Sequence, residues 1–154
     1  MITTIIKQLC LQESEDYFLT KHPERVKELG EVFTPTSLVL EMLEKLPEET
    51  WEESKTFLDP TCGNGQFLAA VLITKISLGH NITKALETIY GVDIMQDNVE
   101  ECRQRLLDIV KDIGKTEITD KHTEIVEHNI LCRDGLTYDY SFEPSTLDSL
   151  FEET

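Results

Sequence analysis

Short apolar runs alternate with helical periods along most of this chain. Three short runs predict buried strands, at residues 56–58, 89–93 and 129–132. Two longer apolar patterns lie between these runs and predict helices, at residues 66–78 and 97–113. The alternation of strand, helix and strand implies a parallel sheet with right-handed crossovers.

Turn and cap residues sharpen the boundaries of these elements. Asn81 is placed to cap a short helix that ends at Glu87. Asp97 and Glu100 resemble a capping box that opens the helix after the second strand. Gly114 is placed to close that helix.

Helical patterns are also expected before the first strand. Residues 3–20 and 23–29 form the first two, with Gly30 as the stop of the second. An extended connection at 31–36 leads to a third helix at 37–46, which Pro47 ends. Its apolar face is expected to consist of Val39, Met42, Leu43 and Leu46. Trp51 is interpreted as a packing residue.

Charge and cysteine content restrict the function classes. The chain of 154 residues holds 30 acidic against 14 basic residues, a formal net charge of −16. Because nucleic-acid-binding proteins gain much of their affinity from Lys and Arg contacts to phosphates, this chain alone is not expected to bind DNA strongly. A solvated acidic surface is favoured over a functional acidic face, which stays open. The four cysteines form no C-x-x-C pair, so zinc and a disulfide scaffold are not expected.

Compartment follows from what the sequence lacks. No apolar run is long enough to span a bilayer, and the start has no basic region followed by a long apolar region. We therefore expect reduced thiols and a cytoplasmic location.

Acidic residues follow each predicted strand, and a glycine turn follows the first. Asp59, Asp93 and Asp134 occupy these positions, and Gly63 and Gly65 let the backbone turn sharply. In an open parallel sheet, ligands bind just beyond this edge. The helix after the turn offers N–H groups to a carboxylate or phosphate, and an acid after the second strand can accept both ribose hydroxyls. Single strand-end acids are often only caps or turn formers, but three in order with the turn favour a nucleotide-like cofactor.

Four ordered motifs resemble those of N6-adenine-specific DNA methyltransferases, which use S-adenosylmethionine. The most specific is Asp59–Phe67, which is similar to the family pattern D-P-x-C-G-x-G-x-F. The other three are residues 30–35, 91–94 and 129–136, and the resemblance covers about residues 28–143. It implies an α/β fold: a truncated Rossmann-like sheet of about three to four parallel strands with helices on its faces. Residues 1–30 would be an N-terminal helical segment, and residues 31–154 the cofactor-binding domain of a single compact unit.

The resemblance also implies which residues bind S-adenosylmethionine. They are Phe33, Thr34, Pro35, Asp59, Pro60, Gly63, Gly65, Phe67, Asp93, Ile94 and Asp134. The first three would contact the methionine end, and the residues of the glycine turn would approach its amino and carboxylate groups. Asp93 would hold the ribose, Ile94 would pack on adenine and Asp134 would accept from its amine. Phe33 could equally be a core anchor, Pro35 could simply start the next helix, and Cys62 is expected to be a packing residue.

The acceptor motif of the family, D/N/S-P-P-Y/F/W, is missing. None of the five prolines is followed by another, and residues 146–151 resemble the beginning of the strand that would precede that motif. No catalytic residue is therefore assigned, and two classes stay open. In the first, the chain is the cofactor-binding part of a DNA methyltransferase, which either needs a partner chain or is a fragment or shortened relative of the enzyme. In the second, it is a non-catalytic cofactor-binding or acidic DNA-mimicking regulator, as in anti-restriction. A small-molecule or protein methyltransferase is a weaker third interpretation.

An open sheet of three or four strands has an exposed edge that invites pairing with another chain. We expect a second methyltransferase subunit or a homodimer to associate through the C-terminal sheet edge, residues 144–154. No metal, no membrane and only weak DNA binding by this chain are expected.

Overall fold

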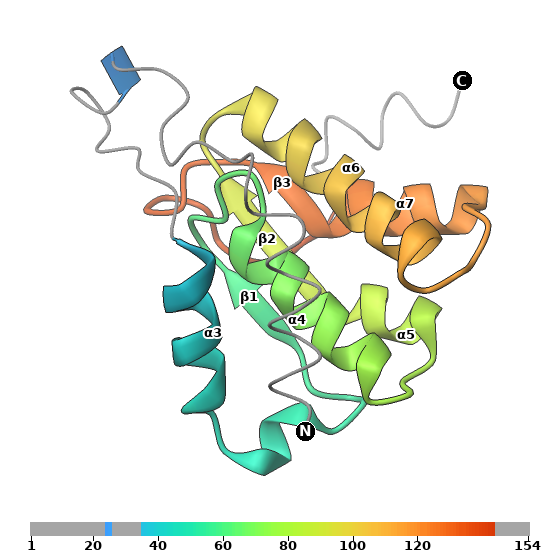
Figure 1. Cartoon of the computed structure of the whole chain (residues 1–154). Helices are drawn as coiled ribbons and strands as arrows, with labels where there is room; N and C mark the ends of the chain where they lie inside the picture. Colours follow the sequence, from blue (N-terminus) through green and yellow to red (C-terminus); the bar gives the residue numbers. More distant parts are fainter. Residues whose placement is uncertain (1–23, 26–34, 144–154) are drawn as a thin grey trace.

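Three parallel strands form the centre of the molecule (Figure 1). The structure, a computed structural model, describes residues 24–25 and 35–143. Strands β1 (Phe57–Asp59), β2 (Ile89–Asp93) and β3 (Ile130–Cys132) lie in that order across the sheet. Phe57 is in register with Ile89 and Gly91 with Ile130, so the carboxyl ends of the three strands meet at one edge.

The helices that connect the strands cover one face of this sheet. α4 (Gln66–Ser77) and α5 (Ile82–Glu87) connect β1 to β2, and α6 (Gln96–Asp112) and α7 (Asp120–Asn129) connect β2 to β3. Both crossovers advance in the same direction across the sheet. Because such crossovers are almost always right-handed, their helices lie on the same face. Accordingly α4 packs against α6, and α5 packs against α7 (Figure 1). The main hydrophobic core lies between these helices and the sheet.

A further helix, α3 (Thr36–Glu44), precedes the sheet and packs against α4. Its buried side chains are Val39, Leu40 and Leu43. The expectation that Met42 belongs to this buried face is wrong, since its exposed fraction is 46 %. After α3, the short 3-10 helix η1 (Glu48–Trp51) brings the Trp51 ring to 5.2 Å from the Phe57 ring, as expected of a packing residue.

Aromatic residues after β3 contact the other face of the sheet. Gly91 faces α4, because a Cβ built on it would lie 2.7 Å from Leu68 Cδ1, and therefore the neighbouring Tyr90 faces away from the helices. The Phe142 ring packs edge-on against Tyr90, with 4.8 Å between centroids. Tyr138 and Tyr140 complete a cluster with Phe142, and these three residues are called the aromatic strap.

Most predicted elements are confirmed, one helix was missed and one predicted helix cap is wrong. All three strands lie within one residue of their predicted bounds, and Asn81 caps α5 by accepting from the N–H of Lys84 at 3.0 Å. Helix α7 is an element that the sequence analysis did not predict. The capping box at Asp97 is wrong: α6 begins one residue earlier, and the side chain of its N-cap residue, Met95, makes no capping hydrogen bond.

The predicted helix at 3–20 and the connection at 31–34 lie outside the described residues, as does the segment 144–154. Glu24 and Arg25, inside the predicted helix at 23–29, are helical. Within the part of the chain that is described, no helix is long and apolar enough to cross a membrane.

Candidate functional site

The loop between β1 and α4, residues 60–65, is called the glycine loop. It turns tightly at the carboxyl edge of the sheet. The N–H of Cys62 donates to the Val92 carbonyl at 2.9 Å, and the N–H of Gly65 donates to the Cys62 carbonyl at 2.9 Å. Gly63 and Gly65 have φ values of 54° and 91°, in the left-handed region that favours glycine. The loop therefore begins α4 directly above the sheet, with the N–H groups of the first helical turn at this edge.

Close packing fixes the glycine loop against α6. A Cβ built on Gly65 would lie 2.7 Å from Cys102 Sγ, and one built on Gly91 would lie 3.1 Å from Cys62 Sγ. Both thiols are buried. A hydrogen bond with Cys102 and burial raise the pKa of the Cys62 thiol far above its ordinary value. Cys62 is thus a neutral packing group, as expected, and not a nucleophile.

Asp93 connects this loop to the next helix. Its Oδ2 accepts from the N–H of Gly63 at 3.0 Å. Its Oδ1 accepts from the N–H of Met95 at 2.9 Å and from Nδ2 of Asn98 at 3.2 Å. One carboxylate therefore positions the glycine loop and the start of α6 relative to each other.

Asp59 lies half-buried at the end of β1. Its Oδ1 accepts from the N–H of Thr61 at 3.1 Å. Burial raises the pKa of this carboxyl above its ordinary value of 3.8; the Thr61 hydrogen bond opposes that effect, and the nearby Asp93 charge adds to it.

The loop after β3 contacts the glycine loop, which follows β1. The Asp134 side chain is exposed, and its Oδ1 accepts from the N–H of Leu136 at 2.9 Å. A Cβ built on Gly135 would lie 2.6 Å from the Pro60 carbonyl oxygen, so the loop after β3 contacts the glycine loop. The N–H of Arg133 donates to the Asp93 carbonyl at 3.0 Å and joins β3 to β2 at the same edge.

The strand-end acids and the glycine loop, which were predicted from the sequence, therefore gather at one edge of the sheet. The strand-end acids and the glycine loop are neighbours, Ile94 beside them has an exposed fraction of 52 %, and Phe67 lies half-buried against the core. Pro35 immediately precedes α3, and its carbonyl accepts from the N–H groups of Leu38 and Val39. Phe33 and Thr34 lie outside the described residues.

Two asparagines of this edge were missed by the sequence analysis. Asn98 holds Asp93, and Asn64 is buried within the glycine loop, where its Nδ2 donates to Glu101 Oε1 at 3.2 Å. Asn64 Oδ1 is buried and has no hydrogen-bond partner among the described residues. In the sequence, only the position of Asn64 between the two glycines could have indicated its place in this loop.

A comparison with known families shows which family this chain belongs to. Residues 10–143 match the family model of the N-6 DNA methylases. The chain belongs to the N-6 DNA methylase family. No curated protein and no solved structure matches it. The family match confirms the resemblance drawn from the four motifs and identifies a DNA methyltransferase-like protein.

N-6 DNA methylases generally use S-adenosylmethionine. In this member, the matched region contains the whole described sheet, the glycine loop and the three strand-end acids. The match ends at the aromatic strap, just after Phe142. The family thus accounts for the elements that position the candidate site.

Proposed function

We propose that this chain binds S-adenosylmethionine at the carboxyl edge of its sheet and is the cofactor-binding part of an adenine-N6 DNA methyltransferase. The observation that carries the proposal is the contact of all three strand-end loops at one edge. The glycine loop touches Gly135, and it is bound by the Asp93 carboxylate.

The chemistry of the edge fits this cofactor. The first turn of α4 offers N–H donors to the carboxylate of the methionine moiety. Each carboxylate oxygen has two lone-pair sites, and Oδ2 of Asp93 accepts one hydrogen bond from the described residues, so it retains capacity for a ribose hydroxyl. Exposed Ile94 offers an apolar surface to adenine, and Asp134 offers an acceptor to the adenine amine. When bound, the cofactor supplies a methyl group on a sulfonium.

The acceptor side of the reaction needs groups that this sequence does not contain. No two prolines are adjacent among the 154 residues, so the D/N/S-P-P-Y/F/W motif is absent. The proposal therefore includes a partner chain that carries this motif and contacts the DNA. Residues 144–154, which lie outside the described residues, are the segment proposed for that association, or for a homodimer.

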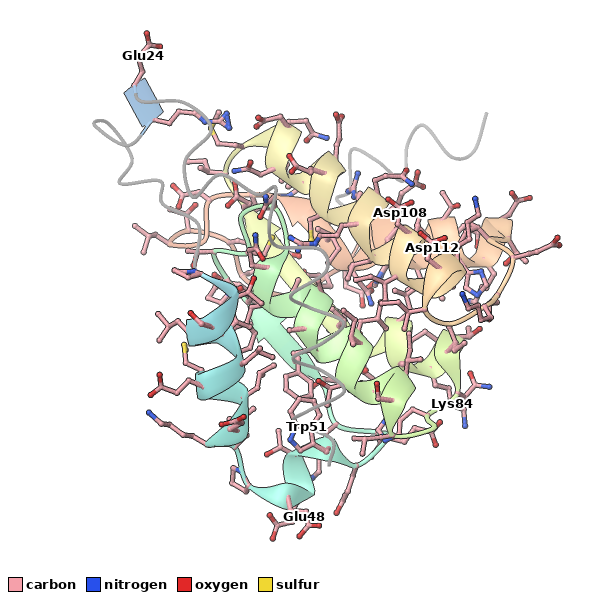
Figure 2. The ribbon with its side chains drawn as sticks, in the orientation of Figure 1. Glu24, Glu48, Trp51, Lys84, Asp108 and Asp112 are labelled. Carbon is pink, nitrogen blue, oxygen red and sulfur yellow. The ribbon has the colours of Figure 1, made fainter. Side chains whose placement is uncertain are left out.

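The net charge supports a second candidate, a non-catalytic cofactor-binding protein or an acidic mimic of DNA. No aspartate or glutamate is buried in the described ranges, and the formal net charge of the chain is −16. Figure 2 shows Asp108 and Asp112 projecting from α6, and Glu48 projecting from η1. Such a surface competes with DNA for basic proteins instead of binding DNA.

Calorimetry with S-adenosylmethionine tests the claim that both candidates share. We expect saturable binding by the native chain and at least about tenfold weaker binding by Asp134→Ala, which corresponds to about 1.4 kcal/mol. Asp108→Ala on the outer side of α6 is the matched control and should bind normally. Asp93→Ala should abolish binding, but it also removes the acceptor of three hydrogen bonds, so its fold must be checked by circular dichroism. A native chain that does not bind the cofactor would overturn the proposal.

A methyl-transfer assay on adenine-containing DNA separates the two candidates. The cofactor-binding part of an enzyme should transfer labelled methyl groups only when a chain with the proline-proline motif is added. Cofactor binding without transfer under any pairing, together with inhibition of basic DNA-binding proteins, would favour the acidic mimic.

A further inference from the structure

The carboxylate of Asp93 uses its two oxygens differently. Oδ1 accepts two hydrogen bonds, from the N–H of Met95 at 2.9 Å and from Nδ2 of Asn98 at 3.2 Å. Oδ2 accepts one hydrogen bond from the described residues, from the N–H of Gly63 at 3.0 Å. A carboxylate oxygen offers about two lone-pair sites. Both sites of Oδ1 are therefore filled from the start of α6, and the remaining capacity lies on Oδ2, beside the glycine loop.

Asn98 is an uncommon residue type for the place that it occupies. It lies in the first turn of α6, and its exposed fraction is 0 %, the same as that of its apolar neighbour Val99. Positions buried this completely mostly hold apolar residues, because an amide taken out of water costs free energy unless it is hydrogen-bonded. The Asn98 amide is hydrogen-bonded to the carboxylate of Asp93. We therefore looked for its role in what that carboxylate does.

The angle of the Asp93 carboxylate depends on its hydrogen-bond donors. The torsion about the Cβ–Cγ bond of an aspartate has only broad minima, so it does not set this angle by itself. The N–H groups of Gly63 and Met95 hold one point on each oxygen, and Nδ2 of Asn98 adds a third point. Without Asn98, one lone-pair site of Oδ1 opens and the carboxylate is held by two donors instead of three.

We propose that Asn98 is a positioning residue for cofactor binding: it occupies Oδ1 of Asp93 and thereby directs Oδ2 toward a ribose hydroxyl. This inference rests on the proposed function, because ribose binding by Asp93 is part of that proposal. It goes further, since it assigns recognition of the ribose hydroxyls to Asp93 and Asn98 together. Asn98 acts through the carboxylate and does not need to contact the cofactor.

Calorimetry with two ligands tests the role of Asn98. One ligand is S-adenosylmethionine, and the other is its 2′,3′-dideoxy analogue, which lacks both ribose hydroxyls. We expect the native chain to bind S-adenosylmethionine at least about tenfold more tightly than the analogue. In Asn98→Ala this ratio should fall to about threefold or less, with an affinity for the analogue within about twofold of the native value. A general loosening of the fold would instead weaken both ligands.

Asn129→Ala is the matched control. Asn129 is also a buried asparagine, with an exposed fraction of 4 %, and its Nδ2 donates to the Glu87 carbonyl at 3.1 Å. It is the last residue of α7, directly before β3, and therefore lies at the sheet edge opposite the candidate site. This variant loses a comparable buried hydrogen bond, but its ratio of affinities for the two ligands should equal that of the native chain.

A measurement on the native chain keeps the inference testable if Asn98→Ala does not fold. The side-chain amide signals of Asn98 in nuclear magnetic resonance spectra should shift at saturation with S-adenosylmethionine and shift much less with the dideoxy analogue. The side-chain amide signals of Asn129 should not shift with either ligand. The same shift of the Asn98 signals with both ligands would overturn the inference.

The outcomes separate this inference from the proposed function. If the native chain prefers S-adenosylmethionine to the analogue and Asn98→Ala keeps the full preference, only the role of Asn98 is refuted. Equal weakening of both ligands by Asn98→Ala would also refute it, because the residue would then act on the fold as a whole. A native chain that does not bind S-adenosylmethionine overturns the proposed function, and this inference falls with it.

Discussion

The three strand-end acids occupy equivalent positions in the sheet, yet their side chains have different surroundings. Asp93 accepts three hydrogen bonds, Asp134 is exposed, and Asp59 is half-buried beside another carboxylate. Their positions could be predicted from the sequence, because each follows an apolar run. Their environments could not, since these depend on loops that meet only after folding.

At Asp59, the raised pKa predicts a gain in stability when the charge is removed. Below pH 3.8 the carboxyl is protonated in both the folded and unfolded chain, so Asp59→Asn should change stability little. As pH rises through the raised folded pKa, the ionised form destabilises the folded native chain, whereas the amide of the variant stays neutral and can still accept from Thr61. Thermal unfolding measured between about pH 3 and 8 should give the variant a higher midpoint than the native chain only at the upper end of this range. Each 1 kcal/mol of added stability raises the midpoint by about 2–4 °C.

Asp134→Asn is the matched control for that experiment, because the Asp134 carboxylate is exposed. Its unfolding midpoint should follow that of the native chain across the same pH range. A variant at position 59 that is less stable than the native chain at pH 7 would contradict the assigned effect of burial.

Asp97 illustrates what sequence reasoning misses at this scale. Its spacing from Glu100 predicted a helix cap, but its carboxylate forms a forked ion pair with Arg25, with nitrogen–oxygen distances from 2.6 to 3.1 Å. The two residues are 72 positions apart, so no local sequence pattern predicts this ion pair.

Among the elements, α7 shows why hydrophobic periodicity can fail. Its buried positions include His122 and Asn129 beside Ile125 and Val126, so half of the buried face is polar. His122 serves the helix start, where its Nδ1 accepts from the N–H of Thr119 at 3.1 Å. A search for apolar spacing therefore finds too few positions to predict a helix here. The strands and α4 were predictable because most of their buried positions are apolar, although α4 also buries Thr74 and Lys75.

The junction of β1 and α4 predicts different costs for two glycine substitutions. Gly65→Ala should destabilise the fold by about 2–4 kcal/mol, because φ is +91° and the new Cβ would lie 2.7 Å from Cys102 Sγ. Gly79→Ala is the matched control: its φ is +80°, but no atom lies within 4 Å of the new Cβ, so about 1–2 kcal/mol is expected. Urea unfolding measures both.

A second change separates packing from backbone strain at this junction. In Cys102→Ala, the thiol 2.7 Å from the new Cβ is absent, and the remaining Cβ and Cα of residue 102 lie 3.3 and 3.4 Å from it. Adding Gly65→Ala to that variant should therefore cost less than it does in the native chain, although still more than Gly79→Ala. Equal costs of the two glycine substitutions in the native chain would contradict the close packing of α4 against α6.

At the scale of the whole molecule, the alternation of strands and helices predicts a parallel sheet, which the structure confirms, but it does not determine the strand order β1-β2-β3. The aromatic strap could not be predicted either. Tyr140 and Phe142 have φ values of 56° and 52°, which non-glycine residues seldom adopt. Phe142 packs on Tyr90 of β2, which is distant in the sequence, and its N–H donates to the nearby Tyr138 hydroxyl at 2.7 Å.

The net charge of −16 predicts that salt stabilises the native chain. Repulsion among exposed carboxylates opposes folding, and raising NaCl from about 0.02 to 0.5 M shortens its range from roughly 20 Å to 4 Å. The midpoint of thermal unfolding should therefore rise with salt. Replacing Asp108 and Asp112 with lysine should reduce that rise, and a midpoint independent of salt would contradict it.

The thiols of Cys62 and Cys102 are enclosed between the glycine loop and α6, and this gives the protein a built-in reporter. An alkylating reagent can reach them only when the loop separates from the helix. The rate of their modification therefore equals the fraction of molecules in which the loop is open multiplied by the intrinsic rate of thiolate modification. Any molecule that rests on the loop and holds it closed would slow the labelling, whatever its chemical identity.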